Sequence, residues 1–329
     1  MGLVQDALVG AHCMTQKDVF FDKNQMMDLM MTIDQCYLLP TPAILKPQSL
    51  WTGKQAISLI LPRITIKQTF KDLDGFVMVQ GELLSGDLCK KTLGAASGGI
   101  IHQTSKLISP QVALDFMNAC QLMCNHFMDS HGFSIGLSDC MTDDTTNTLV
   151  QSTVAECLTQ VSEIESLASE LNIPLKQREH AVGNLLGQVL AITGSQVQKA
   201  MKPDNALGIM VNSGSKGSLI NIAQITATVG QNTVDGNRIM KKNHPEQRTL
   251  NYYPPHCTTP ESRGFIHTPY IQGLNPTSFF NHDDQCCVIS KTFFMYKKVP
   301  KKGGKVGVFF WLFRHKKIIF FVCIFFCFF

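Results

Sequence analysis

The sequence predicts an α+β protein, with a mixed, β-rich first region followed by a mainly α-helical second region that contains a long helical hairpin. Three observations carry this prediction. Residues 76–84 read as two short apolar strands around Gly81. Four prolines between residues 40 and 62 break up any regular element there. Residues 148–200 then carry apolar side chains at helical spacing, with one interruption at 172–174.

The elements of the first region follow from local signals. Residues 22–31 form an expected short helix, because Asp22 is a good N-cap and apolar residues follow at helical spacing. Residues 76–84 form a β-hairpin, and Ile100 with Ile101 is interpreted as the start of another strand. Residues 111–127 carry a broad apolar face that predicts a helix. A turn-rich crossing is expected over residues 132–139.

The second region is expected to begin near residues 140–147, where Asp143 supplies an N-cap. A long helix over 148–171 ends at Asn172-Ile-Pro174, and a second long helix over 175–200 completes the hairpin. The apolar residues expected to face the partner helix are Leu149, Val154, Leu158, Val161, Ile164, Leu167 and Leu171. A further helix is predicted over residues 219–229.

Charge is unevenly distributed along the chain. The formal net charge is +4. Residues 291–329 hold nine Lys and Arg and no acidic residue, which leaves 20 basic and 25 acidic residues in 1–290. The net positive charge therefore comes from residues 291–329 and does not indicate a nucleic-acid-binding surface spread over the whole chain.

The last part of the chain has an unusual composition. Eleven of the 21 phenylalanines lie in residues 291–329. The apolar run 318–329 has twelve residues, fewer than the roughly 20 that cross a bilayer. Extending it upstream would bury a cluster of basic residues, so a membrane anchor is not expected. We interpret 283–329 as an aberrant Phe- and Lys-rich tail.

Cysteine use points to a reducing compartment. The chain has twelve cysteines and no C-x-x-C pair. The first residues lack the basic start and apolar core of a secretory signal. Free thiols in an intracellular setting are therefore expected.

The most informative stretch is Ser213-Gly-Ser-Lys216-Gly-Ser, in which one lysine stands among small residues. Small residues let a backbone approach a ligand closely, and a lysine can present a point charge to a phosphate. The spacing is not that of a P-loop. On composition alone, a solvated turn is the more common explanation.

The wider stretch 210–231, with Val234-Asp-Gly-Asn-Arg238-Ile, closely resembles the funnel region of the largest subunit of multisubunit DNA-directed RNA polymerases. The eukaryotic polymerase II type, or a related viral type, is the nearest. Further blocks follow in the order of that family, and together the similarity covers about residues 1–282. These blocks are 2–10, 42–47, 50–55, 81–86, 90–94, 132–139, 248–250, 260–265 and 270–280.

The resemblance implies a separate role for each of the two regions. Residues 1–143 would form the pore domain beneath the active site, and 144–282 the funnel domain through which nucleotides enter. Lys216 would contact the triphosphate of the incoming nucleotide. Asn221, Gln224, Gln231 and Arg238 match polar positions behind the bridge helix, where amatoxins bind in sensitive enzymes. Helix packing is an equally open explanation for these four residues. Lys46, Lys54, Lys90 and Lys91 would either face the pore or support the active-site barrel, and the resemblance gives them no specific role.

The resemblance also implies what this stretch does not supply. The three aspartates that hold the catalytic Mg²⁺ in the family would precede residue 1. The bridge helix would follow the counterpart of 279–282, and the trigger loop lies further on. We therefore expect no catalytic residue here and no activity of the chain alone. The apolar segment 182–190 and Asn237 depart from the usual family pattern, which suggests a divergent viral or protist lineage.

The family implies several partners and a location. The chain is expected to assemble with other polymerase subunits, especially the second-largest, around DNA template, RNA and nucleoside triphosphates. The expected location is the nucleus, or the cytoplasm or virion for a viral enzyme. A stand-alone interaction module derived from a polymerase, or a pseudogene product without catalysis, stays an alternative. A membrane-tethered protein is a distant third.

Two apparent metal motifs are discounted. Asp72 and Asp74 precede a hairpin, but two carboxylates alone do not make the cage that metal-assisted phosphoryl transfer needs. His244, His256, Cys257 and His267 match no standard zinc spacing. No metal ligand is therefore predicted.

Overall fold

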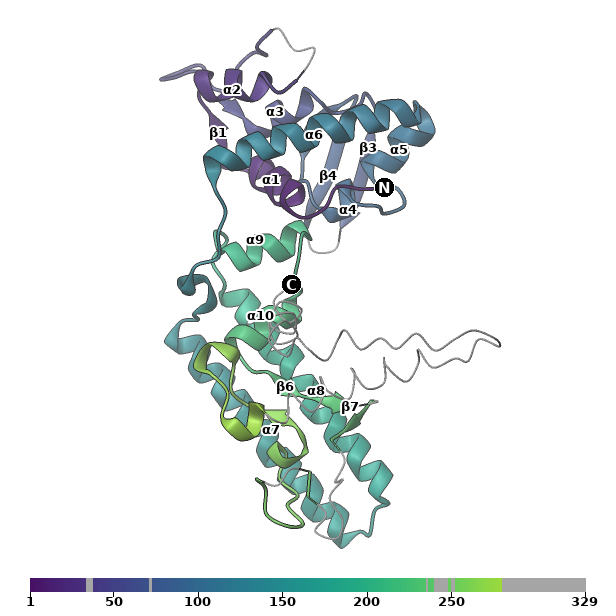
Figure 1. Ribbon diagram of the computed structural model, residues 1–329, viewed down its shortest axis with the longest axis vertical. Helices are drawn as coiled ribbons and strands as arrows, with labels where there is room; N and C mark the ends of the chain where they lie inside the picture. Colours follow the sequence, from purple (N-terminus) through teal and green to yellow (C-terminus); the bar gives the residue numbers. More distant parts are fainter. Residues whose placement is uncertain (34–37, 71–72, 235, 240–247, 250–251, 280–329) are drawn as a thin grey trace, which may run out of the picture. The chain divides into compact units, whose positions relative to one another are not determined.

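The computed structural model describes residues 1–33, 38–70, 73–234, 236–239, 248–249 and 252–279 (Figure 1). The predicted tail, 283–329, lies outside the described residues. The chain divides into two compact units. The first unit comprises residues 1–136 and 202–218, and the second comprises 137–201 and the described residues from 219 onward. The predicted α+β fold is confirmed.

Helix α1 (Asp6–Thr15) is the central element of the first unit. Nine of its residues, from Ala7 to Thr15, are buried, so the helix is covered on nearly all sides. It packs against α6 (Pro110–His131), α3 (Gly53–Ser58) and α9 (Ala206–Ser213). The predicted helix over 111–127 is confirmed, and α6 extends beyond it at both ends. Its buried face is Ala113, Phe116, Cys120, Met123, Cys124 and Phe127.

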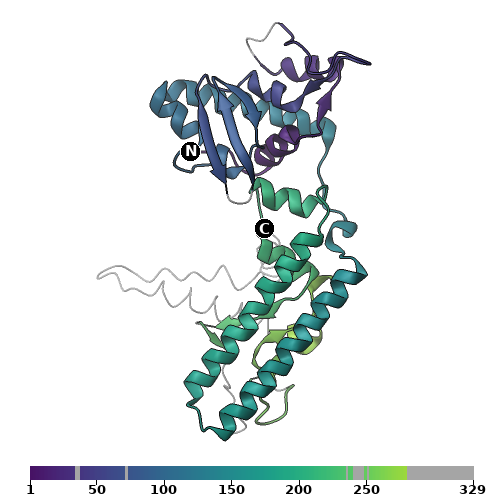
Figure 2. The same ribbon diagram turned by 180° about the vertical axis from the view of Figure 1, so that it is seen from behind.

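A three-stranded antiparallel sheet forms the β part of the first unit (Figure 2). Its strands are β3 (Ile66–Phe70), β4 (Leu73–Val79) and β5 (Glu82–Ser85), in that order. The predicted hairpin is β4–β5. Gln80 and Gly81 both have positive φ, at 49° and 88°, which suits a tight two-residue turn. Strand β3 was not predicted.

Short elements complete the first unit. Helix α2 (Lys23–Met30) begins at Asp22, whose carboxylate accepts from the Gln25 backbone, as predicted. Strands β1 (Phe20–Phe21) and β2 (Trp51–Thr52) pair antiparallel, and Thr52 caps α3. The prediction of a strand at Ile100 is wrong. These residues begin α5 (Ile100–Leu107), where Ile100, Ile101 and Thr104 form one buried helical face.

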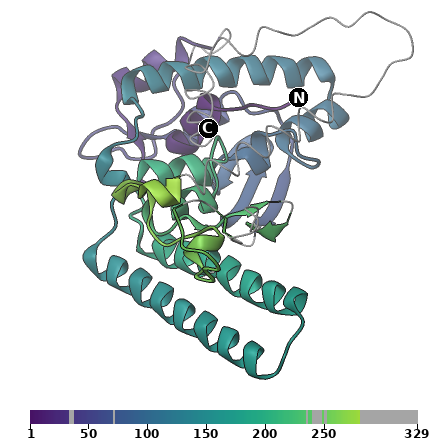
Figure 3. The same cartoon turned by 60° about the horizontal axis from the view of Figure 1, so that its bottom comes forward.

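The second unit is built on the predicted long helical hairpin of α7 (Asp144–Glu170) and α8 (Leu175–Ala200), which lie side by side (Figure 3). Asp143 is the N-cap residue, although its side chain makes no capping hydrogen bond. Asn172, with φ of 50°, and Pro174 end α7 as predicted. The buried residues of α7 are Thr146, Val150, Val154, Cys157, Val161 and Ala168, and the steps between them up to Val161 are four, four, three and four residues.

The remaining elements pack against the hairpin. Helix α10 (Leu219–Thr226) is three residues shorter than predicted, since residues 227–229 lead into β6 (Gly230–Gln231). Strand β6 pairs with β9 (Phe265–Ile266), and β7 (Thr233–Val234) pairs with β8 (Asn237–Arg238). Phe265 is buried with the α7 and α8 side chains. Short 3₁₀ turns lie at η1 (Leu137–Cys140), η2 (Glu261–Arg263) and η3 (Tyr270–Gln272).

Within the described ranges, no helix is both long and apolar enough to span a membrane. The apolar run 318–329, considered above as an anchor, lies outside those ranges.

Candidate functional site

The turn that carries Lys216 follows α9 in the first unit. Gly214 ends the helix in the left-handed conformation, with φ of 72°. The Ser213 and Ser215 hydroxyls both donate to the Met210 carbonyl oxygen, at 3.0 Å each. Gly217 also has positive φ. The small residues therefore close the helix end and shape the backbone beneath the lysine.

The Lys216 turn lies directly against α4 (Lys90–Leu93). A Cβ on Gly214 would stand 2.6 Å from the Lys90 Cβ, closer than two carbon atoms can approach. Helix α4 is held at its start by the Cys89 backbone, which donates to the Thr92 hydroxyl at 3.0 Å. Glycine at position 214 therefore brings the Lys216 turn next to Lys90.

The Lys216 turn and α4 together carry three lysines. Lys216 is half-buried, whereas Lys90 and Lys91 are exposed. Within the described part of the chain, neither Lys216 nor Lys90 forms an ion pair with an acidic side chain. Two ammonium groups without a carboxylate partner attract an anion, and a phosphate group is the anion for which lysine is a common point-charge partner.

Lys54 and Lys46, the other two lysines considered in the first unit, are not placed beside the Lys216 turn. Lys54 forms an ion pair with Asp87, with Nζ and Oδ1 3.8 Å apart. Lys46 is exposed. The described contacts therefore give neither residue a place beside Lys216.

Asn221 and Gln224, the next two predicted site residues, lie on α10 in the second unit. Asn221 is half-buried. Gln224 is also half-buried, and its amide donates to the Val229 carbonyl oxygen at 3.4 Å. That bond links the helix to the segment that follows it, so Gln224 supports the local fold. Contact of either residue with a ligand stays a prediction.

Gln231 and Arg238 belong to a buried polar cluster around β6 and β8. The Gln231 amide donates to the carbonyl oxygens of Asn232 and Arg263, at 2.7 and 2.9 Å. Arg238 is 5% exposed, and its Nη1 lies 3.4 Å from Glu179 Oε2. Burial, which outweighs the nearby Glu179 charge, lowers the pKa of Arg238. These contacts favour the packing interpretation for both residues.

Glu179 and Arg263 complete this cluster and were not singled out in the sequence. Arg263 Nη2 lies 3.1 Å from the same Oε2 atom of Glu179 that Arg238 approaches. Two guanidinium groups therefore share one carboxylate oxygen. This shared ion pair could not be predicted from the sequence, because Glu179 is 59 residues from Arg238 and 84 from Arg263.

Among the described residues, no three or more His, Cys, Asp or Glu side chains lie close enough together to hold a metal ion. His244 and Asp72 fall outside the described residues, and Cys257 lies 3.3 Å from the Thr259 hydroxyl. The described residues do not fit a catalytic Mg²⁺, so no chemical step is assigned to one here.

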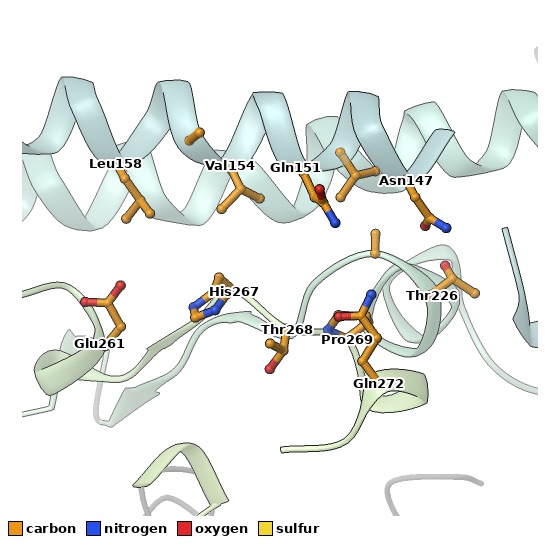
Figure 4. A pocket seen from close by; sticks show the side chains of 13 residues that line it. Asn147, Gln151, Val154, Leu158, Thr226, Glu261, His267, Thr268, Pro269 and Gln272 are labelled. Carbon is orange, nitrogen blue, oxygen red and sulfur yellow. The ribbon is translucent and has the colours of Figure 1, made fainter. Parts of the chain in front are cut away.

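A second feature is a trough in the second unit, with a volume of about 420 Å³ (Figure 4). Helix α7 forms one wall, and the 261–272 segment forms the other. Val150, Val154 and Leu158 supply an apolar surface. The polar residues that line it include Asn147, Gln151, Glu261, His267 and Gln272.

Comparison with known protein families identifies the chain. Residues 1–140 match the family described as RNA polymerase Rpb1, domain 3. Residues 143–266 match RNA polymerase Rpb1, domain 4. The chain belongs to the family of RNA polymerase largest subunits. The resemblance found in the sequence is thereby confirmed.

Family membership defines the broad activity. Subunits of this family work in DNA-directed RNA polymerase, which is a nucleotidyltransferase that carries out transcription. They act in an assembly with other polymerase subunits. The two matched domains meet between residues 140 and 143, close to the point where the predicted first region ends.

Proposed function

We propose that the chain contributes the pore and funnel through which nucleoside triphosphates reach the polymerase active site. Residues 1–143 form the pore domain and 144–282 the funnel domain in this proposal. Lys216 contacts the triphosphate of the arriving nucleotide. Asn221 and Gln224 lie at the surface behind the bridge helix, and Gln231 and Arg238 support that surface through their packing. The reaction itself uses Mg²⁺ held by residues outside those described here.

One observation carries the assignment to Lys216. Its turn lies against Lys90, and within the described residues neither lysine has a carboxylate partner. A triphosphate is densely negative, so two lysines on neighbouring segments favour its approach. Half-burial of Lys216 strengthens the attraction, because the surroundings of a partly buried charge are less polarisable than water.

The setting follows from the family. The partners in this proposal are the second-largest subunit and the other polymerase subunits, together with DNA template, RNA and nucleoside triphosphates. Nuclear transcription is the expected setting, with a viral enzyme in the cytoplasm or virion as the second choice. The chain alone is expected to be inactive.

The test places Lys216→Ala in the intact polymerase that contains this chain. Loss of one charged contact to phosphate costs about 1.5–3 kcal/mol, so the apparent KM for nucleoside triphosphates should rise about tenfold or more. RNA synthesis on a fixed template, measured over a range of nucleotide concentrations, gives KM and kcat separately. Lys216→Arg, which keeps the charge, should restore most of the loss.

Lys199→Ala is the matched control, because Lys199 is an exposed lysine at the end of α8. It should leave the apparent KM unchanged. An unchanged KM in Lys216→Ala would contradict the proposed contact. A polymerase that fails to assemble would instead show a structural role for Lys216.

A further inference from the structure

Thr15 is a buried polar residue to which the proposed function gives no role. It is the last residue of α1, and its side chain is fully buried. Its hydroxyl donates to the Ala11 carbonyl oxygen at 2.7 Å and accepts from the Leu88 backbone N–H at 2.9 Å. Thr15 therefore joins the end of α1 to a backbone group 73 residues away.

His12 of the same helix bonds the other backbone group of Leu88. Its Nδ1 lies 3.1 Å from the Leu88 carbonyl oxygen. A carbonyl oxygen only accepts, so Nδ1 carries the proton and donates it. The Leu88 side chain is itself fully buried, and buried backbone groups need partners. Residue 88 is therefore fixed to α1 by two buried hydrogen bonds.

The residue that α1 fixes lies two positions before Lys90, the first residue of α4. Between them, the Cys89 backbone N–H donates to the Thr92 hydroxyl at 3.0 Å and so joins the first turn of the helix. The start of α4 is thereby tied to α1, and the backbone of Lys90 is placed with it. The Lys90 Cβ in turn lies against Gly214, in the turn that carries Lys216.

Helix α1 supports the Lys216 turn by a second route. It packs against α9, and the turn follows directly after the last residue of α9. One buried helix therefore holds both segments that carry the lysines, the Lys216 turn through α9 and Lys90 through residue 88.

We propose that Thr15 is a positioning residue for the triphosphate contact. By holding Leu88 it places Lys90 beside the Lys216 turn, so that both ammonium groups act on one triphosphate. Thr15 itself touches no substrate. The inference rests on the proposed function, because it needs Lys216 to contact the triphosphate. Without the hydroxyl, the Leu88 N–H would be buried with no partner, a cost that a shift of residues 88–90 would relieve.

Thr15→Val in the intact polymerase tests this proposal, because valine has nearly the shape of threonine and no hydroxyl. The apparent KM for nucleoside triphosphates should rise about threefold, less than in Lys216→Ala because both charges are kept, and kcat should change little. Thr15→Ser keeps the hydroxyl and should bring KM back close to its original value. RNA synthesis over a range of nucleotide concentrations gives both constants.

Thr104→Val is the matched control. Thr104 is fully buried in the same unit, and its hydroxyl donates to the carbonyl oxygen of Ile100, four residues earlier, as that of Thr15 does to Ala11. Among the described residues, this hydroxyl makes no bond to segment 87–93. Thr104→Val should leave KM unchanged. Amide hydrogen exchange in residues 88–93 should become about tenfold faster in Thr15→Val and stay the same in Thr104→Val.

A background without the two ammonium groups separates positioning from general damage to the fold. In the double variant Lys90→Ala with Lys216→Ala, Thr15→Val should raise KM no further, because the groups that it positions are gone. Alanine at position 90 keeps the Cβ that packs against Gly214. A merely structural role would raise KM by the same factor in both backgrounds, which would overturn the inference.

The remaining outcomes separate the inference from the proposed function. An unchanged KM in Thr15→Val, where Lys216→Ala raises KM, overturns the inference alone. An unchanged KM in Lys216→Ala overturns the proposed function as well. If Thr15→Val does not assemble, Thr15→Cys decides in its place, since a thiol is a weaker acceptor of similar size. It should raise KM by a smaller factor, and an unchanged KM in this variant would also overturn the inference.

Discussion

Gly214 and Lys90 are packed so closely that a Cβ on the glycine would lie 2.6 Å from the Lys90 Cβ. The two residues are far apart in the sequence, and their contact joins the Lys216 turn to α4. Glycine is required at position 214 for a second reason as well, because its φ of 72° lies in the left-handed region. The position of Lys216 therefore depends on the absence of a side chain at 214.

Gly214→Ala should destabilise the first unit by about 1–3 kcal/mol, because strain at positive φ adds to the steric clash. The free energy of unfolding from urea denaturation of the purified chain measures this. Gly187→Ala is the control, since Gly187 is exposed in α8 and a Cβ there meets nothing within 4 Å. It should stabilise by roughly 0.5–1 kcal/mol, as alanine favours helices. Equal effects of the two changes would contradict the packing at Lys90.

The helical hairpin offers a test of which face is buried. Leu186 of α8 is fully buried among side chains of α7 and α8, whereas Leu149 of α7 is 50% exposed. Leu186→Ala should cost about 2–5 kcal/mol of unfolding free energy. Leu149→Ala should cost no more than about 0.5 kcal/mol. Circular dichroism during urea denaturation measures both, and similar losses would show that the helix is rotated from the orientation described here.

The same hairpin shows how far the sequence could predict the fold. The limits of α8 and the stop at Asn172 followed from spacing and from Pro174. The core face of α7 did not, because three predicted contact residues, Leu149, Leu167 and Leu171, are exposed. The buried positions instead include Thr146, Cys157 and Ala168, whose small side chains carry a weak apolar signal. Which of two overlapping apolar stripes is buried depends on α8 and Phe265, which are distant in the sequence.

Glu179 should be important for the stability of the second unit. Its carboxylate is shared by Arg238 and Arg263, and the Arg238 side chain is only 4% exposed. The contact with Glu179 is made by Nη1 of Arg238, and among the described residues Nε and Nη2 have no hydrogen-bond partner. Glu179→Gln should therefore destabilise by about 3–5 kcal/mol, since it leaves a buried charge uncompensated.

Glu165→Gln is the matched control for this change. Glu165 is about as exposed as Glu179, at 21% against 25%, but among the described residues its carboxylate forms an ion pair only with Arg178, at 3.8 Å. Its loss should cost no more than about 1 kcal/mol. Both values come from urea denaturation at neutral pH. Equal costs for the two variants would contradict the shared ion pair.

His12 should make the stability of the first unit depend on pH. Burial lowers the pKa of His12 and outweighs the opposing effects of Asp87 and the Leu88 carbonyl, whose oxygen lies 3.1 Å from Nδ1. Below pH about 6.5 the unfolded chain binds a proton that the folded chain resists, so the unfolding free energy should fall as the solution is acidified. Above that pH the imidazole is neutral in both states, and this dependence should vanish.

His12→Gln should flatten the pH dependence of the melting temperature between pH about 6.5 and the lowered pKa of His12. His180→Gln, at an exposed position on α8, should leave it intact. A slope that is the same in His12→Gln and in the unaltered chain would show that other groups cause the dependence. An NMR titration of the His12 ring would then give its pKa directly.

Only part of the candidate site could be predicted from the sequence. The Ser213-Gly-Ser-Lys216 pattern identified a lysine in a turn of small residues, and the structure places that turn after α9 as a helix end. Lys90 had no assigned role, because nothing local links it to Lys216. Arg238 was grouped with ligand-facing residues on family resemblance, yet its burial with Glu179 depends on a contact across 59 residues. Such long-range contacts leave no periodic signal.

The most direct test of the account is native purification of the chain from its source through an antibody against residues 144–200. Mass spectrometry then identifies and quantifies the proteins that remain bound at high stringency. We expect stoichiometric recovery of the second-largest subunit of RNA polymerase, together with template-dependent RNA synthesis in the purified sample. A chain recovered free of polymerase subunits would contradict it and would favour the stand-alone interaction module.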